Sequence, residues 1–154
     1  MNPLIILHET LYPYEEVITY FQSPNTKYHV CIRKDGRIIY CANPLDVVFN
    51  CGRNTSYLGE EMNGSVDPIA YHVCLESPYS SKPGDREHEG YTREQYKSLA
   101  WLVKATGVDI TRLIGHSDLD TNPGLDPRSF SFSRFFTWYT NTKTDRKIDI
   151  KRYE

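Results

Sequence analysis

Two histidines and one aspartate are the residues of this chain best suited to hold a metal ion. His8 directly follows the apolar run Leu4–Leu7, and His116 follows a second such run. Asp126 lies on the polar loop beyond His116, where Pro127 restrains its backbone. If the two runs are neighbouring strands, all three side chains emerge at one edge of the sheet. Such a set suits catalytic zinc, which takes three protein ligands and keeps a fourth position open for water.

Each of these residues also has an ordinary structural interpretation. A loop rich in Ser, Asp, Asn and Pro is typical of a protein surface, so His116 could be an incidental surface histidine. His8 could be a hydrogen-bonded histidine at a strand end. The His-Glu-x-x-His pattern of helix-borne zinc hydrolases is absent from the sequence, and spacing along the chain cannot decide between these interpretations.

The elements that would position these side chains are strands interleaved with helices. Apolar runs and turn signals predict strands over 4–7, 28–32, 37–41, 69–75 and 112–115. Helical spacing of apolar residues predicts a helix over 14–21, and a short helix is also predicted over 132–139. A capping box at Thr92 opens a third helix, which ends at Gly107 and whose apolar positions 96, 99, 100, 102 and 103 form one stripe facing the core. This order predicts an α/β fold, with a mixed central sheet flanked by helices.

The clearest hairpin joins the strands over 28–32 and 37–41. Asp35-Gly36 predicts a two-residue turn between them. Alternation along the first strand places Tyr28 on the face of Val30 and opposite His29, which we take as structural.

Two connecting segments are polar. We expect no regular structure in residues 53–68. Residues 77–90 hold two Pro and two Gly and are typical of a mobile surface loop that could close over a groove. We expect His88, inside this loop, to be solvated.

Size and charge limit the possible classes of protein. A chain of 154 residues is most simply one domain, which we assign to residues 1–140. Residues 141–154 form a charged C-terminal tail, either an edge strand or a frayed end. The formal net charge of −2 gives no electrostatic case for binding nucleic acid or an anionic membrane. The oligomeric state is not readable from the sequence.

Membrane insertion and secretion signals are not expected. No apolar run approaches the roughly 20 residues of a membrane span. The N-terminus lacks the basic and apolar regions of a signal peptide. The four cysteines form no C-x-x-C pair, so we expect reduced structural thiols and synthesis in a reducing cytoplasm.

Six segments, taken in order from about residue 4 to 136, resemble one enzyme family. They are LIILHET, KYHVCIRKDGRIIY, VVFNCG, IAYHVCLE, YTREQYKSLAWLV and GHSDLDTNPGLDPRSF. The set is similar to the zinc-dependent N-acetylmuramoyl-L-alanine amidases, a family that includes phage lysozyme-type amidases and the peptidoglycan recognition proteins.

The resemblance implies that His8, His116 and Asp126 bind Zn²⁺ and that Tyr28 is catalytic. The implied reaction is hydrolysis of the amide between N-acetylmuramic acid and L-alanine, in peptidoglycan or in muropeptides. Zinc would lower the pKa of its bound water toward about 7 and polarise the scissile carbonyl. Tyr28 would orient that water or donate to the developing oxyanion. His72 aligns with a catalytic glutamate and is either a general base or a buried strand histidine.

Two positions depart from the family pattern. Gly124 stands where many members have a lysine, and Arg128, Asn122 or His72 could replace that group. Asn50 stands where the family often has a histidine. We expect Asn50 and Arg128 to contact substrate.

Three functions remain open at this point. The first is a zinc amidase acting on peptidoglycan or muropeptides. The second is a non-catalytic peptidoglycan-binding module of the same fold, and the third is a zinc amidase or peptidase with another substrate. A phage lysin acting after cell lysis, a cytoplasmic recycling enzyme and a delivered antibacterial effector all fit a chain without a signal peptide.

Overall fold

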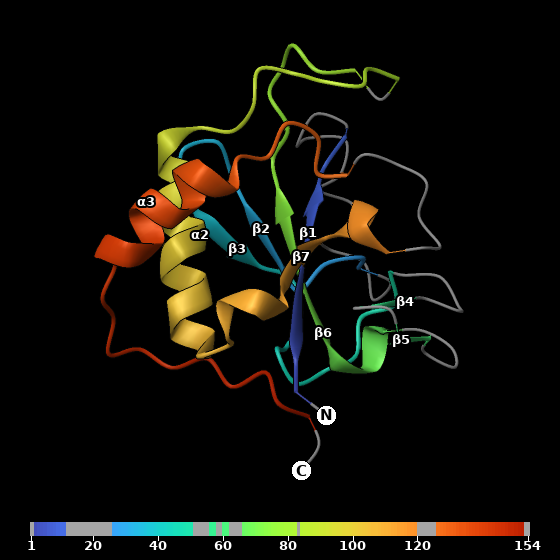
Figure 1. Cartoon of the computed structure of the whole chain (residues 1–154), viewed down its shortest axis with the longest axis vertical. Coiled ribbons are helices and arrows are strands. Elements are labelled where there is room, and N and C mark those ends of the chain that lie inside the picture. The colour runs from blue at the N-terminus through green and yellow to red at the C-terminus, as the bar shows by residue number, and fades with distance from the viewer. Residues whose placement is uncertain are drawn as a thin grey trace.

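The computed structural model describes residues 2–11, 26–50, 56–57, 60–61, 66–82, 84–119 and 126–152. The helix predicted over 14–21 lies outside these residues. A five-stranded sheet in the order β3-β2-β6-β1-β7 forms the centre of the molecule (Figure 1). Its strands are β1 (Leu4–Glu9), β2 (Val30–Ile32), β3 (Ile38–Tyr40), β6 (Ala70–Leu75) and β7 (Leu113–Gly115). Four of them are parallel and β3 runs antiparallel to β2, so the predicted mixed sheet is confirmed.

The strand β1 lies next to the edge of the sheet and pairs with β6 on one side and with the edge strand β7 on the other. All six of its residues are buried, as expected for a strand of a parallel sheet that is covered on both faces. Alternate residues face opposite ways. Ile5 and Leu7 pack toward the helices, whereas Leu4 and Ile6 pack on the other face with Ala70 and Leu119.

Two helices cover the first of these faces (Figure 1). The helix α2 (Arg93–Thr106) begins at the predicted capping box, in which Thr92 accepts from the Gln95 N–H, and ends at Gly107 in the left-handed conformation. The apolar stripe predicted for this helix is buried against the sheet. The helix α3 (Phe132–Asn141) packs beside α2 and buries Phe135.

Several local expectations were wrong. The hairpin loop has three residues and not the predicted two. The Arg33 N–H donates to Arg37 O, the Gly36 N–H donates to Arg33 O, and Gly36 has a φ of +90°. Tyr28 packs on the face of Cys31, since regular pairing of β2 begins only at Val30. The segment 53–68 contains the short pair β4 (Ser56–Tyr57) and β5 (Glu60–Glu61) and a 3₁₀ turn, η1 (Asp67–Ile69).

Two further 3₁₀ turns flank β7, namely η2 (Ile110–Arg112) and η3 (His116–Asp118). Cys31, Cys41 and Cys74 are free thiols, as expected. Within the described part of the chain, no helix has the length and apolar character needed to cross a membrane.

The C-terminal segment neither forms the expected edge strand nor frays. Its backbone bonds α2, because the Ile148 N–H donates to Ala105 O over 2.8 Å. Ile150 is only 3% exposed and belongs to the main core. Arg152 reaches Pro44 O and Pro68 O and lies 2.8 Å from Nε2 of His29. This segment is therefore part of the packed body.

We expect Ile150→Ala to lower the free energy of unfolding by about 2–5 kcal/mol, because it removes a buried side chain from the core. Ile148→Ala is the matched control, and its cost should be smaller because Ile148 is only partly buried. Chemical denaturation measures both changes. A loss below about 0.5 kcal/mol for Ile150→Ala, the range typical of surface positions, would contradict the packing described.

Candidate metal centre

The structure brings His8, His116 and Asp126 to one point. Oδ2 of Asp126 lies 3.3 Å from Nδ1 of His8 and 3.4 Å from Nδ1 of His116. One donor atom from each residue lies within 4.8 Å of the other two. The imidazole rings of the two histidines meet edge to face, with centroids 4.7 Å apart.

Strand register and one loop contact produce this convergence. β1 and β7 are parallel neighbours with Leu7 opposite Gly115, so the next residues, His8 and His116, emerge side by side. The Glu9 N–H donates to Oδ1 of Asp126 over 2.5 Å, and the Ser117 N–H donates to the Asp126 carbonyl. Asp126 is thereby held across the ends of both strands, with Oδ2 turned toward the imidazoles.

The electrostatics of the cluster favour a neutral His8 imidazole beside an ionised Asp126 carboxylate. Burial lowers the pKa of His8, although contact with Asp126 acts in the opposite direction. Burial alone would raise the pKa of Asp126, but contacts that include His116 and the Glu9 N–H outweigh it and hold that pKa below its ordinary value. Neutral nitrogens and a carboxylate are the ligand forms that a zinc ion requires.

His72, on the neighbouring strand β6, contacts the ring of His8 on the side away from Asp126. Its Nδ1 is 2.8 Å from Nε2 of His8, and its Nε2 is 2.9 Å from Oδ1 of Asp67. Both His72 and Asp67 are buried, and burial lowers the pKa of His72 to about 4. Both ring nitrogens are therefore occupied, which leaves His72 no free nitrogen for the general-base role considered from the sequence.

The ring of Tyr28 also lies near that of His8, with the two centroids 5.5 Å apart. It packs against Cys31 and Cys74. Burial raises the pKa of Tyr28, so the phenol stays protonated and keeps a proton to donate.

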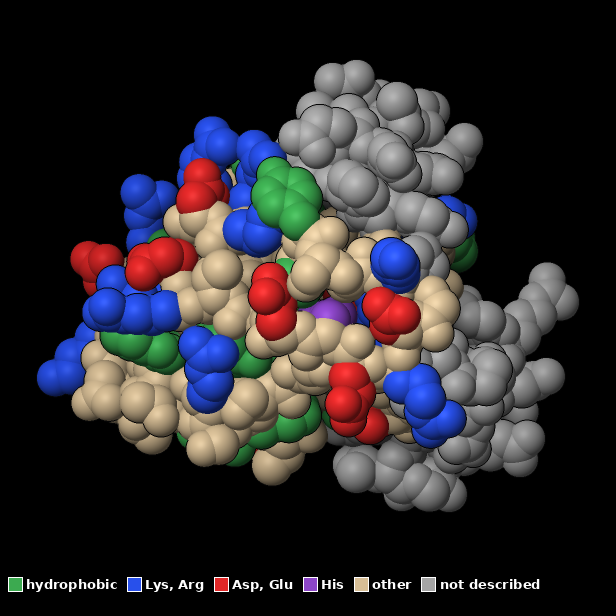
Figure 2. All heavy atoms as spheres, turned by 90° about the horizontal axis from the view of Figure 1, so that it is seen from above, with side chains coloured by type: hydrophobic (Ala, Val, Ile, Leu, Met, Phe, Trp, Pro, Cys, Tyr) green, Lys and Arg blue, Asp and Glu red, His purple; other side chains and the backbone are tan. Residues whose placement is uncertain are grey.

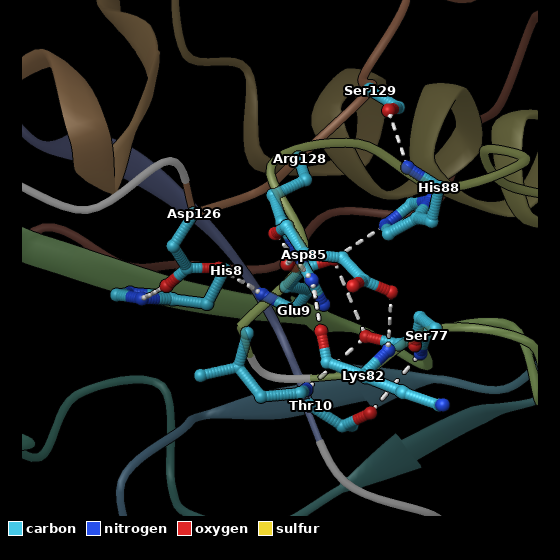
Figure 3. Close-up of polar contacts among 12 residues, drawn as sticks. His8, Glu9, Thr10, Ser77, Lys82, Asp85, His88, Asp126, Arg128 and Ser129 are labelled. Carbon is cyan, nitrogen blue, oxygen red and sulfur yellow. Dashed lines mark hydrogen bonds and ion pairs between the residues drawn. The ribbon is translucent and has the colours of Figure 1, made fainter.

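A second polar cluster is centred on Glu9, whose side chain points to the sheet face opposite His8 (Figure 3). Its buried carboxylate contacts Nε2 of His88 at 2.7 Å and accepts from the Tyr91 hydroxyl at 2.7 Å. Arg128 forms an ion pair with Glu9 and donates to the carbonyls of Lys82 and Asp85. The cluster therefore ties Lys82, residues 85–91 and the loop after Asp126 to the end of β1.

Two sequence expectations change as a result, those for Arg128 and His88, whereas the substrate contact expected of Asn50 stays a prediction. Arg128 is only 3% exposed and bonds the protein itself, so it is not presented to a substrate as expected. The His88 side chain is 1% exposed because Glu9 holds it, so it is not solvated. Asn50 donates from Nδ2 to Lys27 O and from its backbone to Asp67, which anchors its loop.

The sequence analysis missed Glu9 and Asp67 as supporting residues. Glu9 could have been suspected, because it directly follows His8 in a buried strand. Asp67 lies in the polar segment 53–68, where no sequence pattern indicates a role in supporting the site. Gly124 and Asn122 lie outside the residues that the structure describes.

Figure 2 shows the molecule from the side toward which β1 and β6 point in Figure 1. One histidine side chain is visible there in a recess, among acidic and basic side chains and backbone.

Comparison with known proteins places the chain in a family. Residues 2–129 match the N-acetylmuramoyl-L-alanine amidase family. No curated protein matches the chain at a significant level.

Solved structures share the fold. A selenomethionine derivative of AmpD is 21% identical, with a TM-score of 0.65 over 90% of this chain and 85% of that one. The endolysin amidase LysCS of Clostridium intestinale is 22% identical, with a TM-score of 0.61 over 93% and 86%. AMPDH3 of Pseudomonas aeruginosa, solved with an anhydromuramic pentapeptide, is 15% identical, with a TM-score of 0.67 over 82% and 55%. The family match spans most of the chain, and the chain therefore belongs to the N-acetylmuramoyl-L-alanine amidase family.

Proposed function

We propose that this protein is a zinc-dependent hydrolase that cleaves the amide between N-acetylmuramic acid and L-alanine in peptidoglycan or muropeptides. The observation that carries the proposal is the convergence of His8, His116 and Asp126 in a chain of this family. A module that only bound peptidoglycan would have no need for such a cluster at a strand edge.

The donor set fits zinc. Zinc bonds of about 2.0–2.1 Å at tetrahedral angles place neighbouring donor atoms about 3.3 Å apart. The two nitrogen-to-oxygen distances in the cluster are 3.3 and 3.4 Å. Three protein donors leave a fourth position open, which is the arrangement of catalytic zinc sites. When bound, zinc would acidify a water molecule and polarise the carbonyl of the scissile amide.

The protein itself holds the proposed ligand Asp126 in position and supplies a proton donor, Tyr28. The Glu9 N–H holds the carboxylate of Asp126, and the Glu9 carboxylate holds Arg128 in an ion pair. The segment that carries Asp126 is therefore positioned before substrate arrives. Tyr28 lies beside His8, where its phenol could donate to the oxygen that gains negative charge in the transition state.

Digestion of purified murein tests the proposed reaction. We expect release of peptides that carry a free L-alanine amine, without new reducing sugar ends, and mass spectrometry distinguishes these products. A chelator should stop the release and added Zn²⁺ should restore it. Binding of murein without cleavage would instead support a recognition module, and cleavage confined to other amides would support a different substrate.

We expect His116→Ala to lose zinc while keeping the fold, because it removes a direct ligand. The loss of zinc affinity should exceed the roughly 10–100-fold cost of removing a supporting partner. Ser117→Ala, at the neighbouring position, is the matched control and should keep both metal and activity. Metal analysis and circular dichroism measure the two properties. Retention of metal and activity by His116→Ala would overturn the ligand assignment.

We expect Tyr28→Phe to keep its zinc and lower kcat by about 10²–10³, the typical cost of one lost oxyanion donor. Tyr40→Phe, on the neighbouring strand β3, is the control and should turn over normally. Steady-state kinetics on a soluble muropeptide, with metal content measured in parallel, tests this expectation. An unchanged kcat would remove Tyr28 from the mechanism.

A further inference from the structure

We propose that His72, backed by Asp67, is a positioning residue that fixes the ring proton of His8 on Nε2. His8 is then required to present the lone pair of Nδ1 to the metal position. This inference rests on the proposed function, because it concerns the same centre, but it can be tested in metal-free protein.

The argument begins at Asp67, whose two carboxylate oxygens have different partners. Oδ2 accepts the Asn50 N–H over 3.0 Å, and Oδ1 lies 2.9 Å from Nε2 of His72. Since a carboxylate has no proton to give, Nε2 of His72 must be the donor in the second contact. A neutral imidazole carries only one ring proton, so Nδ1 of His72 is an acceptor.

The proton of His8 follows from this assignment. Nδ1 of His72 lies 2.8 Å from Nε2 of His8, in a region where both rings are buried. Because one side of this contact is an acceptor, Nε2 of His8 must donate. Nδ1 of His8 therefore has no proton and carries its lone pair toward Asp126.

The consequence is a pair of acceptors facing each other. Nδ1 of His8 and Oδ2 of Asp126 are 3.3 Å apart with no proton between them, an arrangement that a cation would stabilise. The opposite tautomer would put a proton into the metal position. It would also leave the 2.8 Å contact between His8 and His72 with two acceptors, in a place that water does not reach.

Strand pairing and backbone contacts hold His72 against His8. β1 and β6 pair in parallel, with Ile6 opposite His72. His8 lies two residues beyond Ile6, so its side chain and that of His72 are on the same face of the sheet. The His72 N–H donates to Nδ1 of His29, and the rings of His29 and His72 stack with an interplanar angle of 8°. His72 therefore has little freedom to turn away from His8.

The test compares two replacements of His72 with a matched control. His72→Phe keeps a flat ring but removes the acceptor, whereas the side-chain oxygen of His72→Asn can accept near the former Nδ1 position. Tyr71→Phe, at the adjacent buried position, removes a hydroxyl that has no hydrogen-bond partner among the described residues. Circular dichroism confirms that each variant is folded.

We expect His72→Phe to bind Zn²⁺ about 10–100-fold more weakly in a chelator competition, as for other lost partners of metal-binding histidines. His72→Asn should recover most of this loss, and Tyr71→Phe should bind like the wild type. Equal zinc affinity of His72→Phe and wild type would overturn the proposal, as would a failure of His72→Asn to bind better than His72→Phe.

The second measurement needs neither metal nor activity. In metal-free wild-type protein, ¹⁵N-resolved spectra of the imidazole rings should show His8 protonated at Nε2 and unprotonated at Nδ1. A proton found on Nδ1 of His8 would overturn the proposal even if the enzyme is active. If the protein bound no zinc, the proposed function would fail, whereas this spectrum would still decide whether His72 fixes the His8 tautomer.

Discussion

The parallel register between β1 and β7 is the constraint on which the candidate metal centre depends. Leu7 lies opposite Gly115, so His8 and His116 leave neighbouring strands at the same height although more than a hundred residues separate them. A shift of one residue in either strand would turn one imidazole to the other face of the sheet. The apolar residues of β1 prevent such a shift, because both faces of this strand are buried.

The two polar residues at the end of β1, His8 and Glu9, have different structural roles. His8 points to one face and joins the proposed metal ligands, while Glu9 points to the other face and contacts His88, Tyr91 and Arg128. The backbone between them contributes as well, since the Glu9 N–H holds Asp126. One buried strand end therefore supplies one proposed ligand, a fixed contact to a second proposed ligand and the anchor for the surrounding loops.

The parts of the fold that could be predicted are those set by local pattern. The buried run of β1, the capping box at Thr92 and the apolar stripe of α2 all depend on neighbours within a few residues, and all three are confirmed. The pairs Asp67–His72 and Glu9–Arg128 could not be predicted, because their partners come from loops whose paths no local pattern fixes. His88 was misjudged for the same reason: its polar neighbours in sequence conceal a buried partner.

The buried charges of the Glu9 cluster are better understood as positioning devices than as sources of stability. Removing a carboxylate and a guanidinium from water costs several kcal/mol per ion, and apolar residues of similar volume are often as stable. Arg128, however, follows Asp126 by two residues, and its ion pair with Glu9 ties this loop to the strand that carries His8. An apolar pair would pack without a preferred orientation. The charged pair restricts the loop to one arrangement, and that arrangement keeps the carboxylate of Asp126 between the two imidazoles.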